Sequence, residues 1–309
     1  MTDLNIYAHG KLLISSEYFV LDGAKALAIP THFGQHLKVS YLNLSANQIH
    51  WKAFRSNGEE WLNLNFDKQT LQSNSDSKEA KTLTKILLAA KELNPKFLSG
   101  KENIEIETRL EFQNEWGLGS SSTLIYAIAK WANIDAYTLL QKTMGGSGYD
   151  VACAAIDTPI LYQLKQGKPE VQSIHFLPAF SDQIYFAFLG QKQLSTQGIN
   201  IYKESTADKK SCIKWLDVIT DAMVNCTSIG KFEQLIHEHE QIISETLHLE
   251  RVQSKLFPDY WGKVKSLGAW GGDFVMLTNT RSRRELTDYL NTKNINVIFS
   301  FDEMIYRTV

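Results

Sequence analysis

The 309-residue chain has 32 basic and 34 acidic residues, so it lacks the basic excess typical of proteins that bind nucleic acid or anionic membranes. Hydrophobic residues at 43% and charged residues at 21% are typical of a globular protein, and no apolar run reaches the roughly 18 residues of a membrane span. The start of the chain does not resemble a signal peptide, and we expect a cytoplasmic protein. At this length, two joined domains are expected.

Alternating apolar and polar residues predict a mostly antiparallel sheet in the first half of the chain. A strand at 4–14 is followed by a turn at Asp22-Gly23 and an extended piece that ends at Pro30. Further strands are expected at 35–44, 48–54, 60–66 and 103–112. Helical periodicity predicts helices at 78–93 and 136–143, and residues 151–156 are either helical or tightly packed.

The second half mixes strands with long amphipathic helices. Strands are expected at 160–164, 172–176, 183–189, 274–278 and 297–301, and helices at 208–226, 231–249 and 283–290. This mixture predicts an α+β fold, with a domain boundary near 170–180. The pair of histidines in His237-Glu238-His239-Glu240 does not share a helix face, so we expect a solvated helix surface there and no metal site.

The stretch EWGLGSSSTLIYAIAK, residues 115–130, joins a glycine-serine loop to a predicted helix with Ser120 or Ser121 as its N-cap. Backbone N–H groups and the positive end of the helix dipole would meet at this loop, which suits a phosphate. The preceding strand gives the strand-loop-helix order that a phosphate-binding loop requires. The alternative is an ordinary capped helix after a glycine turn.

Three other stretches combine small residues with polar groups: 9–23, 145–152 and 267–274. HGKLLISSEYFVLDG resembles the first motif of the GHMP kinases, the superfamily of galactokinase, homoserine kinase, mevalonate kinase and phosphomevalonate kinase. WGLGSSST resembles their phosphate loop, GSGYDVA a segment of the mevalonate-pathway members, and LGAWGGDF their third, glycine-rich motif. The motifs follow in family order and span nearly the whole chain.

The resemblance implies a two-lobed fold, with a ribosomal-protein-S5-like domain at 1–175 and a ferredoxin-like domain at 176–309. It implies that ATP and Mg²⁺ are the cofactors, with Ser121 as the metal ligand. The residues over which the ATP phosphates would lie are Gly117, Leu118, Gly119, Ser120, Ser121 and Ser122.

Asp150 would match the aspartate that acts as a base or holds the acceptor hydroxyl, and Lys11 a lysine near the transferred phosphoryl group. An alcohol is a poor nucleophile at neutral pH, which makes a nearby carboxylate chemically sensible. Taken alone, Asp150 could be a helix N-cap and Lys11 a surface lysine at a strand edge. The residues that would contact or adjoin the acceptor are Glu17, Ser147, Gly148, Ser195, Thr196, Gly271 and Gly272. The alternative for Glu17 is a solvated turn residue.

The chain departs from the family pattern at several positions. His9 stands where proline is usual, Ser16 where glycine precedes the glutamate, and Glu115-Trp116 replaces the proline lead of the phosphate loop. Trp270 interrupts the third glycine run, which predicts a narrower or stiffer loop. The second metal-ligating glutamate of mevalonate kinases has no counterpart before Asp150.

The predicted function is an ATP-dependent kinase that phosphorylates mevalonate or phosphomevalonate. The alternatives are a kinase for a sugar or homoserine, and a non-catalytic member that binds a nucleotide or metabolite. A small-molecule substrate is the expected partner, and both a monomer and a homodimer are compatible with the sequence.

Overall fold

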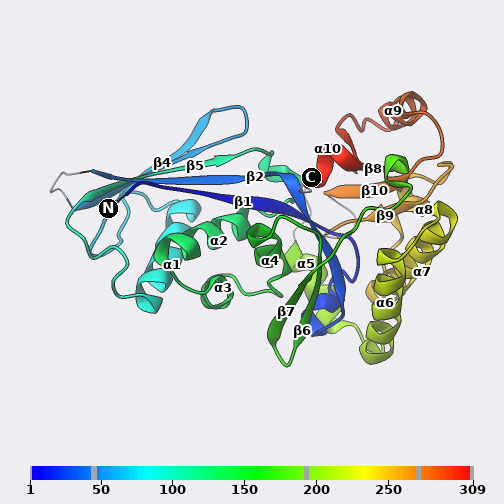
Figure 1. Ribbon diagram of the computed structural model, residues 1–309, viewed down its shortest axis with the longest axis horizontal. Coiled ribbons are helices and arrows are strands. Elements are labelled where there is room, and N and C mark those ends of the chain that lie inside the picture. The colour runs from blue at the N-terminus through cyan, green and yellow to red at the C-terminus, as the bar shows by residue number, and fades with distance from the viewer. Residues whose placement is uncertain (1, 43–46, 191–194, 269, 271–272, 307–309) are drawn as a thin grey trace. The chain divides into compact units, whose positions relative to one another are not determined.

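The computed structural model describes residues 2–42, 47–190, 195–268, 270 and 273–306 (Figure 1). The chain forms two compact units that alternate along the sequence. The first unit contains residues 1–10, 33–114 and 118–155, and the second contains residues 11–32, 115–117 and 156–309. No helix of the described residues is both long and apolar enough to cross a membrane.

The first unit packs helices against a sheet whose strands are ordered β4-β3-β5-β2. Its elements are part of β1 (Leu4–Leu13), part of β2 (Ala26–Leu42), β3 (Gln48–Phe54), β4 (Glu60–Asp67), β5 (Asn103–Leu110), α1 (Lys78–Leu93), α2 (Ser120–Ala132), α3 (Ala136–Thr143) and α4 (Tyr149–Ala155). The β3–β5 pair is parallel, whereas β2–β5 and β3–β4 are antiparallel. The expectation of a mostly antiparallel sheet is confirmed.

The core of this unit lies between the sheet and the helices, which follow one face of the strands in Figure 1. On β5 the side chains alternate, so that Ile104 and Ile106 are buried while Glu105 and Glu107 are exposed. Helix α1 begins at an N-cap, Ser77, whose side chain accepts the N–H of Ala80, and its periodic apolar side chains pack into the core.

The second unit contains a four-stranded antiparallel sheet ordered β11-β8-β10-β9, and a hairpin that pairs with the first part of β2. Its strands are β6 (Ile160–Lys165), β7 (Lys168–Ser173), β8 (Ile184–Phe188), β9 (Val264–Ser266), β10 (Phe274–Thr278) and β11 (Ile298–Ser300). Its α-helices are α5 (Ser195–Glu204), α6 (Lys209–Val224), α7 (Ile229–Leu247), α8 (Val252–Leu256), α9 (Arg283–Thr292) and α10 (Phe301–Met304). The 3₁₀ helices are η1 (Phe19–Asp22), η2 (Asn114–Trp116) and η3 (Ser181–Gln183), of which η2 begins in the first unit.

The predicted α+β class is confirmed, and α1 and α3 have the predicted bounds. The extended piece does not end at Pro30, because β2 continues through it to Leu42. Pro30 lies between the segments that pair with β6 and with β5, and its carbonyl accepts the N–H of Tyr306. The strand expected at 172–176 is instead β7, in a hairpin whose turn residues Gln166 and Gly167 both have positive φ.

Candidate active site

Helix α2 begins at a glycine. Gly119 is the N-cap residue with φ of 94°, a left-handed conformation that glycine adopts without strain, so the predicted N-cap at Ser120 or Ser121 is wrong. Within the described residues no side chain caps α2. Ser121 is exposed at the first turn, whereas the buried Ser122 turns its hydroxyl inward and donates to the Gly119 carbonyl at 2.8 Å. The first turn thus presents N–H groups and the positive end of the helix dipole, as anion sites do.

Three stretches of small residues converge on Gly117. The Lys11 ammonium donates a 2.7 Å hydrogen bond to the Gly117 carbonyl. A Cβ atom on Gly117 would lie 2.3 Å from Oδ2 of Asp273, so this position requires glycine for space as well as for its φ of 66°. Sequence reasoning missed Asp273, although the Gly-Asp pair that ends the third motif was its signal. Leu118, predicted at the phosphates, has a fully buried side chain, so only its backbone can face a ligand.

Trp116, which directly precedes Gly117, packs among aromatic side chains. Its ring packs against the rings of Phe188, Phe274 and Phe299, with centroid distances of 6.5, 5.8 and 5.3 Å. Aromatic packing on the four-stranded sheet therefore anchors the residue that precedes Gly117.

Asp150 lies in the first turn of α4, the helix that packs on α2 in the first unit. Its Oδ1 accepts the N–H of Val151 at 2.9 Å, and the side chain is half-buried. Burial raises the pKa of the nearby Tyr137 hydroxyl to about 12, and the Asp150 charge adds to that shift. Ser147 and Gly148, which precede α4, are buried.

A cavity of about 220 Å³ adjoins the first turn of α2. Its walls combine two tryptophans, Trp51 and Trp61, with the first turns of α1 and α2. Ser120 and Ser121 both line it, so a ligand that fills the cavity would lie beside the uncapped helix end. Sequence reasoning missed this cavity because its lining comes from four strands (β2, β3, β4 and β5), from α1 and α2, and from Asn114 and Met144.

A buried cluster of charged groups lies in the second unit. Lys265 Nζ donates to Glu17 Oε1 and lies 3.6 Å from Glu240 Oε1, while Glu17 Oε2 lies 3.2 Å from His239 Nε2. The exposed fractions of Glu17, His239, Glu240 and Lys265 are 1%, 0%, 2% and 0%. The alternative of a solvated Glu17 is therefore wrong.

We expected residues 237–240 to lie on a solvated helix surface, and this prediction is wrong for His239 and Glu240, which are buried. Phe232, Leu235, Ile236 and Ile243 are the buried apolar positions of α7 around them, and His239 and Glu240 share their 3–4 residue spacing. If the 3–4 residue period of the apolar positions had been extended to polar residues, it would have identified His239 and Glu240 as buried. His237 and Glu238 are exposed, as expected.

Burial controls protonation in this cluster. Burial raises the pKa of Glu17, and the nearby Lys265 charge opposes this rise. Burial also raises the pKa of Glu240, to about 8. Burial holds the pKa of His239 well below its usual value. The backbone N–H of Ser16 donates to His239 Nε2 at 2.8 Å, so the proton of the neutral ring is on Nδ1. At neutral pH Glu240 is therefore mostly protonated and the His239 imidazole is neutral.

Two departures from the family pattern have a local explanation. Ser16 has φ of 64°, the left-handed region that favours glycine, and its hydroxyl donates to the Lys25 carbonyl at 2.7 Å. The Trp270 side chain is buried among the aromatic and aliphatic residues around Tyr18, and the backbone N–H of Trp270 donates to the Tyr18 hydroxyl at 2.9 Å.

The remaining predicted residues are only partly described. Gly271 and Gly272 lie outside the described residues. Ser195 and Thr196 are the first two residues of α5, and their side chains lie outside the described part.

No known family matches the sequence, and neither does any curated protein. Solved structures match over the whole chain. Mevalonate kinase from Methanococcus jannaschii aligns with a TM-score of 0.73 at 15% identity and covers 99% of each chain. Galactokinase from Lactococcus lactis, complexed with galactose, aligns with a TM-score of 0.72 at 10% identity over 98% of this chain and 93% of its own.

Phosphomevalonate kinase from Streptococcus pneumoniae, in complex with phosphomevalonate and AMPPNP, aligns with a TM-score of 0.70 at 14% identity. The alignment covers 96% of this chain and 99% of the kinase. These enzymes act on different substrates, but they share one architecture that extends over essentially all of this chain. The protein therefore has the GHMP kinase fold.

Proposed function

We propose that the protein is an ATP-dependent kinase for a small molecule. The observation that carries this proposal is the first turn of α2, which begins at the left-handed Gly119 and adjoins a cavity with tryptophan walls. The solved structures of the same fold support it, since those compared above are named as kinases and one of them holds the ATP analogue AMPPNP.

The phosphates would lie over the loop formed by Gly117, Leu118 and Gly119 and the serines that follow. Backbone N–H groups and the α2 dipole stabilise negative charge there, and phosphoryl transfer depends mainly on such stabilisation and on alignment. Lys11 is held against this loop by its bond to the Gly117 carbonyl, from which its ammonium can neutralise charge on the transferred group. The nucleoside would occupy the cavity of about 220 Å³ beside Ser120 and Ser121.

Mg²⁺ fits this loop only with the help of the nucleotide. Within the described residues no group of three or more His, Cys, Asp or Glu side chains could hold a metal ion. The exposed Ser121 hydroxyl would be a protein ligand, and phosphate oxygens and water would complete the coordination. Bound there, the ion would neutralise phosphate charge.

We propose Asp150 as the residue that orients the acceptor. The acceptor oxygen attacks the γ-phosphorus, the bond from that phosphorus to the bridging oxygen of ADP breaks, and Asp150 takes the proton of an attacking hydroxyl. Mevalonate would need this base. Phosphomevalonate is already an anion, so Asp150 would only need to orient it, which suits a site poor in carboxylates.

The acceptor side of the site is proposed from the sequence motifs. Ser147, Gly148, Ser195, Thr196, Gly271 and Gly272 are its proposed residues. Glu17 is 1% exposed and paired with Lys265, so we propose that it acts by holding β9, the strand that precedes the third motif. The domains would divide near residue 175.

The test is ADP release, measured with a coupled assay on Mg-ATP and a panel of mevalonate, phosphomevalonate, galactose and homoserine. Release that depends on one compound would establish the kinase and its acceptor. Asp150→Asn should then lower turnover by a factor of about 10² or more and leave ATP affinity unchanged. ATP binding without turnover across the panel would favour another acceptor or the non-catalytic alternative, and absence of ATP binding would refute the proposal.

A further inference from the structure

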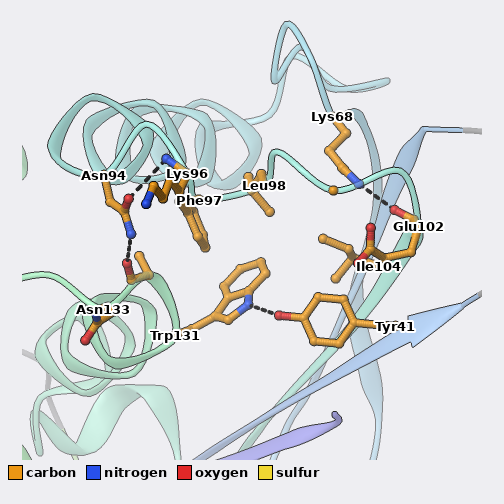
Figure 2. A pocket seen from close by; sticks show the side chains of 12 residues that line it. Tyr41, Lys68, Asn94, Lys96, Phe97, Leu98, Glu102, Ile104, Trp131 and Asn133 are labelled. Atoms are coloured by element: carbon orange, nitrogen blue, oxygen red, sulfur yellow. Dashed lines mark hydrogen bonds between the residues drawn. The ribbon is translucent and has the colours of Figure 1, made fainter. Parts of the chain in front are cut away.

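Two adjoining cavities lie in the first unit, at the ends of α1 and α2 opposite to the proposed nucleotide cavity, and Figure 2 shows the smaller of the two. Their volumes are about 150 and 450 Å³, and they share Lys68, Leu98 and Gly100 as lining residues, so they adjoin each other. Trp131 and Asn133, at the C-terminal end of α2, line the smaller cavity, whereas Ser120 and Ser121 at its N-terminal end line the nucleotide cavity. Helix α2 has 13 residues, so its two ends, and with them the two cavity regions, lie about 20 Å apart.

The smaller cavity is lined by aromatic and aliphatic side chains together with polar residues, among them Asn94, Lys96, Glu102 and Asn133. Figure 2 shows Trp131 between Phe97 and Tyr41, with its Nε1 donating to the Tyr41 hydroxyl at 2.9 Å. The Phe97 and Trp131 rings meet edge to face with centroids 4.6 Å apart, and Ile104 completes the apolar wall. A volume of about 150 Å³ is large enough for a benzene ring. One ring-sized apolar group therefore fits here.

The larger cavity is lined by Lys68, Lys91 and Lys101, and none of its described lining residues is acidic. Lys91 Nζ donates to the Gln69 carbonyl at 2.9 Å, which holds this second ammonium beside the cavity. The single acidic residue of the two linings, Glu102, lines only the smaller cavity. The larger cavity therefore carries an excess of positive charge, which favours an anion.

Lys68 is unusual among these lysines because it is only 2% exposed. Its ammonium donates to the Glu102 carbonyl at 2.5 Å, the single acceptor it reaches within the described residues (Figure 2). An ammonium has three N–H groups, so two of them have no acceptor in that part of the chain. A buried cation with spare donors between two cavities is suited to receive an anionic ligand.

The loop between the cavities is held in an uncommon conformation. Leu98, which lines both cavities, has φ of 61°, which is rare for a bulky side chain. Such backbone strain persists where the surrounding structure enforces it, and it clusters at ligand-binding sites.

We propose that these cavities form one binding site for a small organic phosphate. The phosphate would lie among Lys68, Lys91 and Lys101, and a ring-sized apolar group would lie against Trp131 and Phe97. The site is distinct from the proposed nucleotide cavity and does not depend on kinase activity.

The test is isothermal titration calorimetry of the full-length protein with phenyl phosphate, and with inorganic phosphate as the probe that lacks the ring. We expect one phenyl phosphate per chain, bound at least tenfold more tightly than inorganic phosphate and more weakly at high salt. Lys68→Met should weaken binding at least tenfold, whereas Lys81→Met, an exposed lysine of α1 outside both linings, should not change it.

Lys101→Met provides a second variant, because Lys101 is exposed and its replacement should leave the fold intact. It should weaken phenyl phosphate binding severalfold. Lys11→Met would weaken binding only if the compound occupied the phosphate loop. The proposal is overturned by absence of binding at millimolar concentration, by equal affinity for the two probes, by unchanged affinity in both Lys68→Met and Lys101→Met, or by dependence on Lys11.

Discussion

Replacing Glu240 with glutamine should change how the stability of the protein depends on pH. The carboxyl of Glu240 is 2% exposed, and one of its oxygens lies 3.6 Å from the Lys265 ammonium. Burial raises its pKa from 4.5 to about 8, an effect that the Lys265 charge opposes. In the unfolded chain this group is already ionised at neutral pH, so the native state binds one more proton than the unfolded state between these two pKa values.

The sign follows from this difference in proton binding. A raised native pKa stabilises the fold fully below the unfolded pKa, and this contribution is lost as the pH rises through about 8. The free energy of unfolding should therefore fall by at most about 1.4 kcal/mol for each pH unit, and by roughly 1–2 kcal/mol in total between pH 6.5 and 8, because the slope decreases as the group approaches its native pKa. The window starts at pH 6.5 because His239, whose native pKa is lowered, would lose stability only below that value.

The assay is urea unfolding of the wild type and of Glu240→Gln at pH 6.5, 7, 7.5 and 8. Glutamine keeps the shape of the protonated carboxyl and cannot ionise, so the stability of the wild type relative to the variant should fall across this range. Glu238→Gln is the matched control, because Glu238 is exposed on the same helix, and its difference from the wild type should stay constant. A constant difference for Glu240→Gln would refute a protonated Glu240.

Three further substitutions test the proposed site and its support. Gly117→Ala places a Cβ atom 2.3 Å from an Asp273 oxygen at φ of 66°, so ATP affinity measured by calorimetry should fall at least tenfold, and an unchanged affinity would place the phosphates elsewhere. Asp150→Asn should lower turnover in the coupled ADP assay by a factor of about 10² or more with ATP affinity retained, and normal turnover would remove Asp150 from the reaction. Trp116→Ala removes the ring that packs on three phenylalanines and should lower the free energy of unfolding by about 3–5 kcal/mol, whereas Trp215→Ala, at a residue 65% exposed, should change it little. Equal losses for the two tryptophan variants would contradict the anchoring role.

Much of the secondary structure could be predicted from local patterns. The period of apolar residues gives α1 its correct bounds, and alternation identifies β3 and β5. The strand boundaries that failed, at Pro30 and at 172–176, depend on which strands pair. Pairing joins residues far apart in the chain, so a local pattern carries little information about it.

In the candidate site, too, some features could be predicted from the sequence and others only from the tertiary structure. The sequence by itself determined the order and type of the motifs and the glycine-serine loop before α2, since backbone conformation and dipole direction are local properties. Only the tertiary structure decided that Lys11, Gly117 and Asp273 meet, and that His239 and Glu240 are buried with Lys265. Contact, burial and the resulting pKa shifts depend on groups that the fold brings together from distant parts of the chain, and no local pattern encodes that proximity.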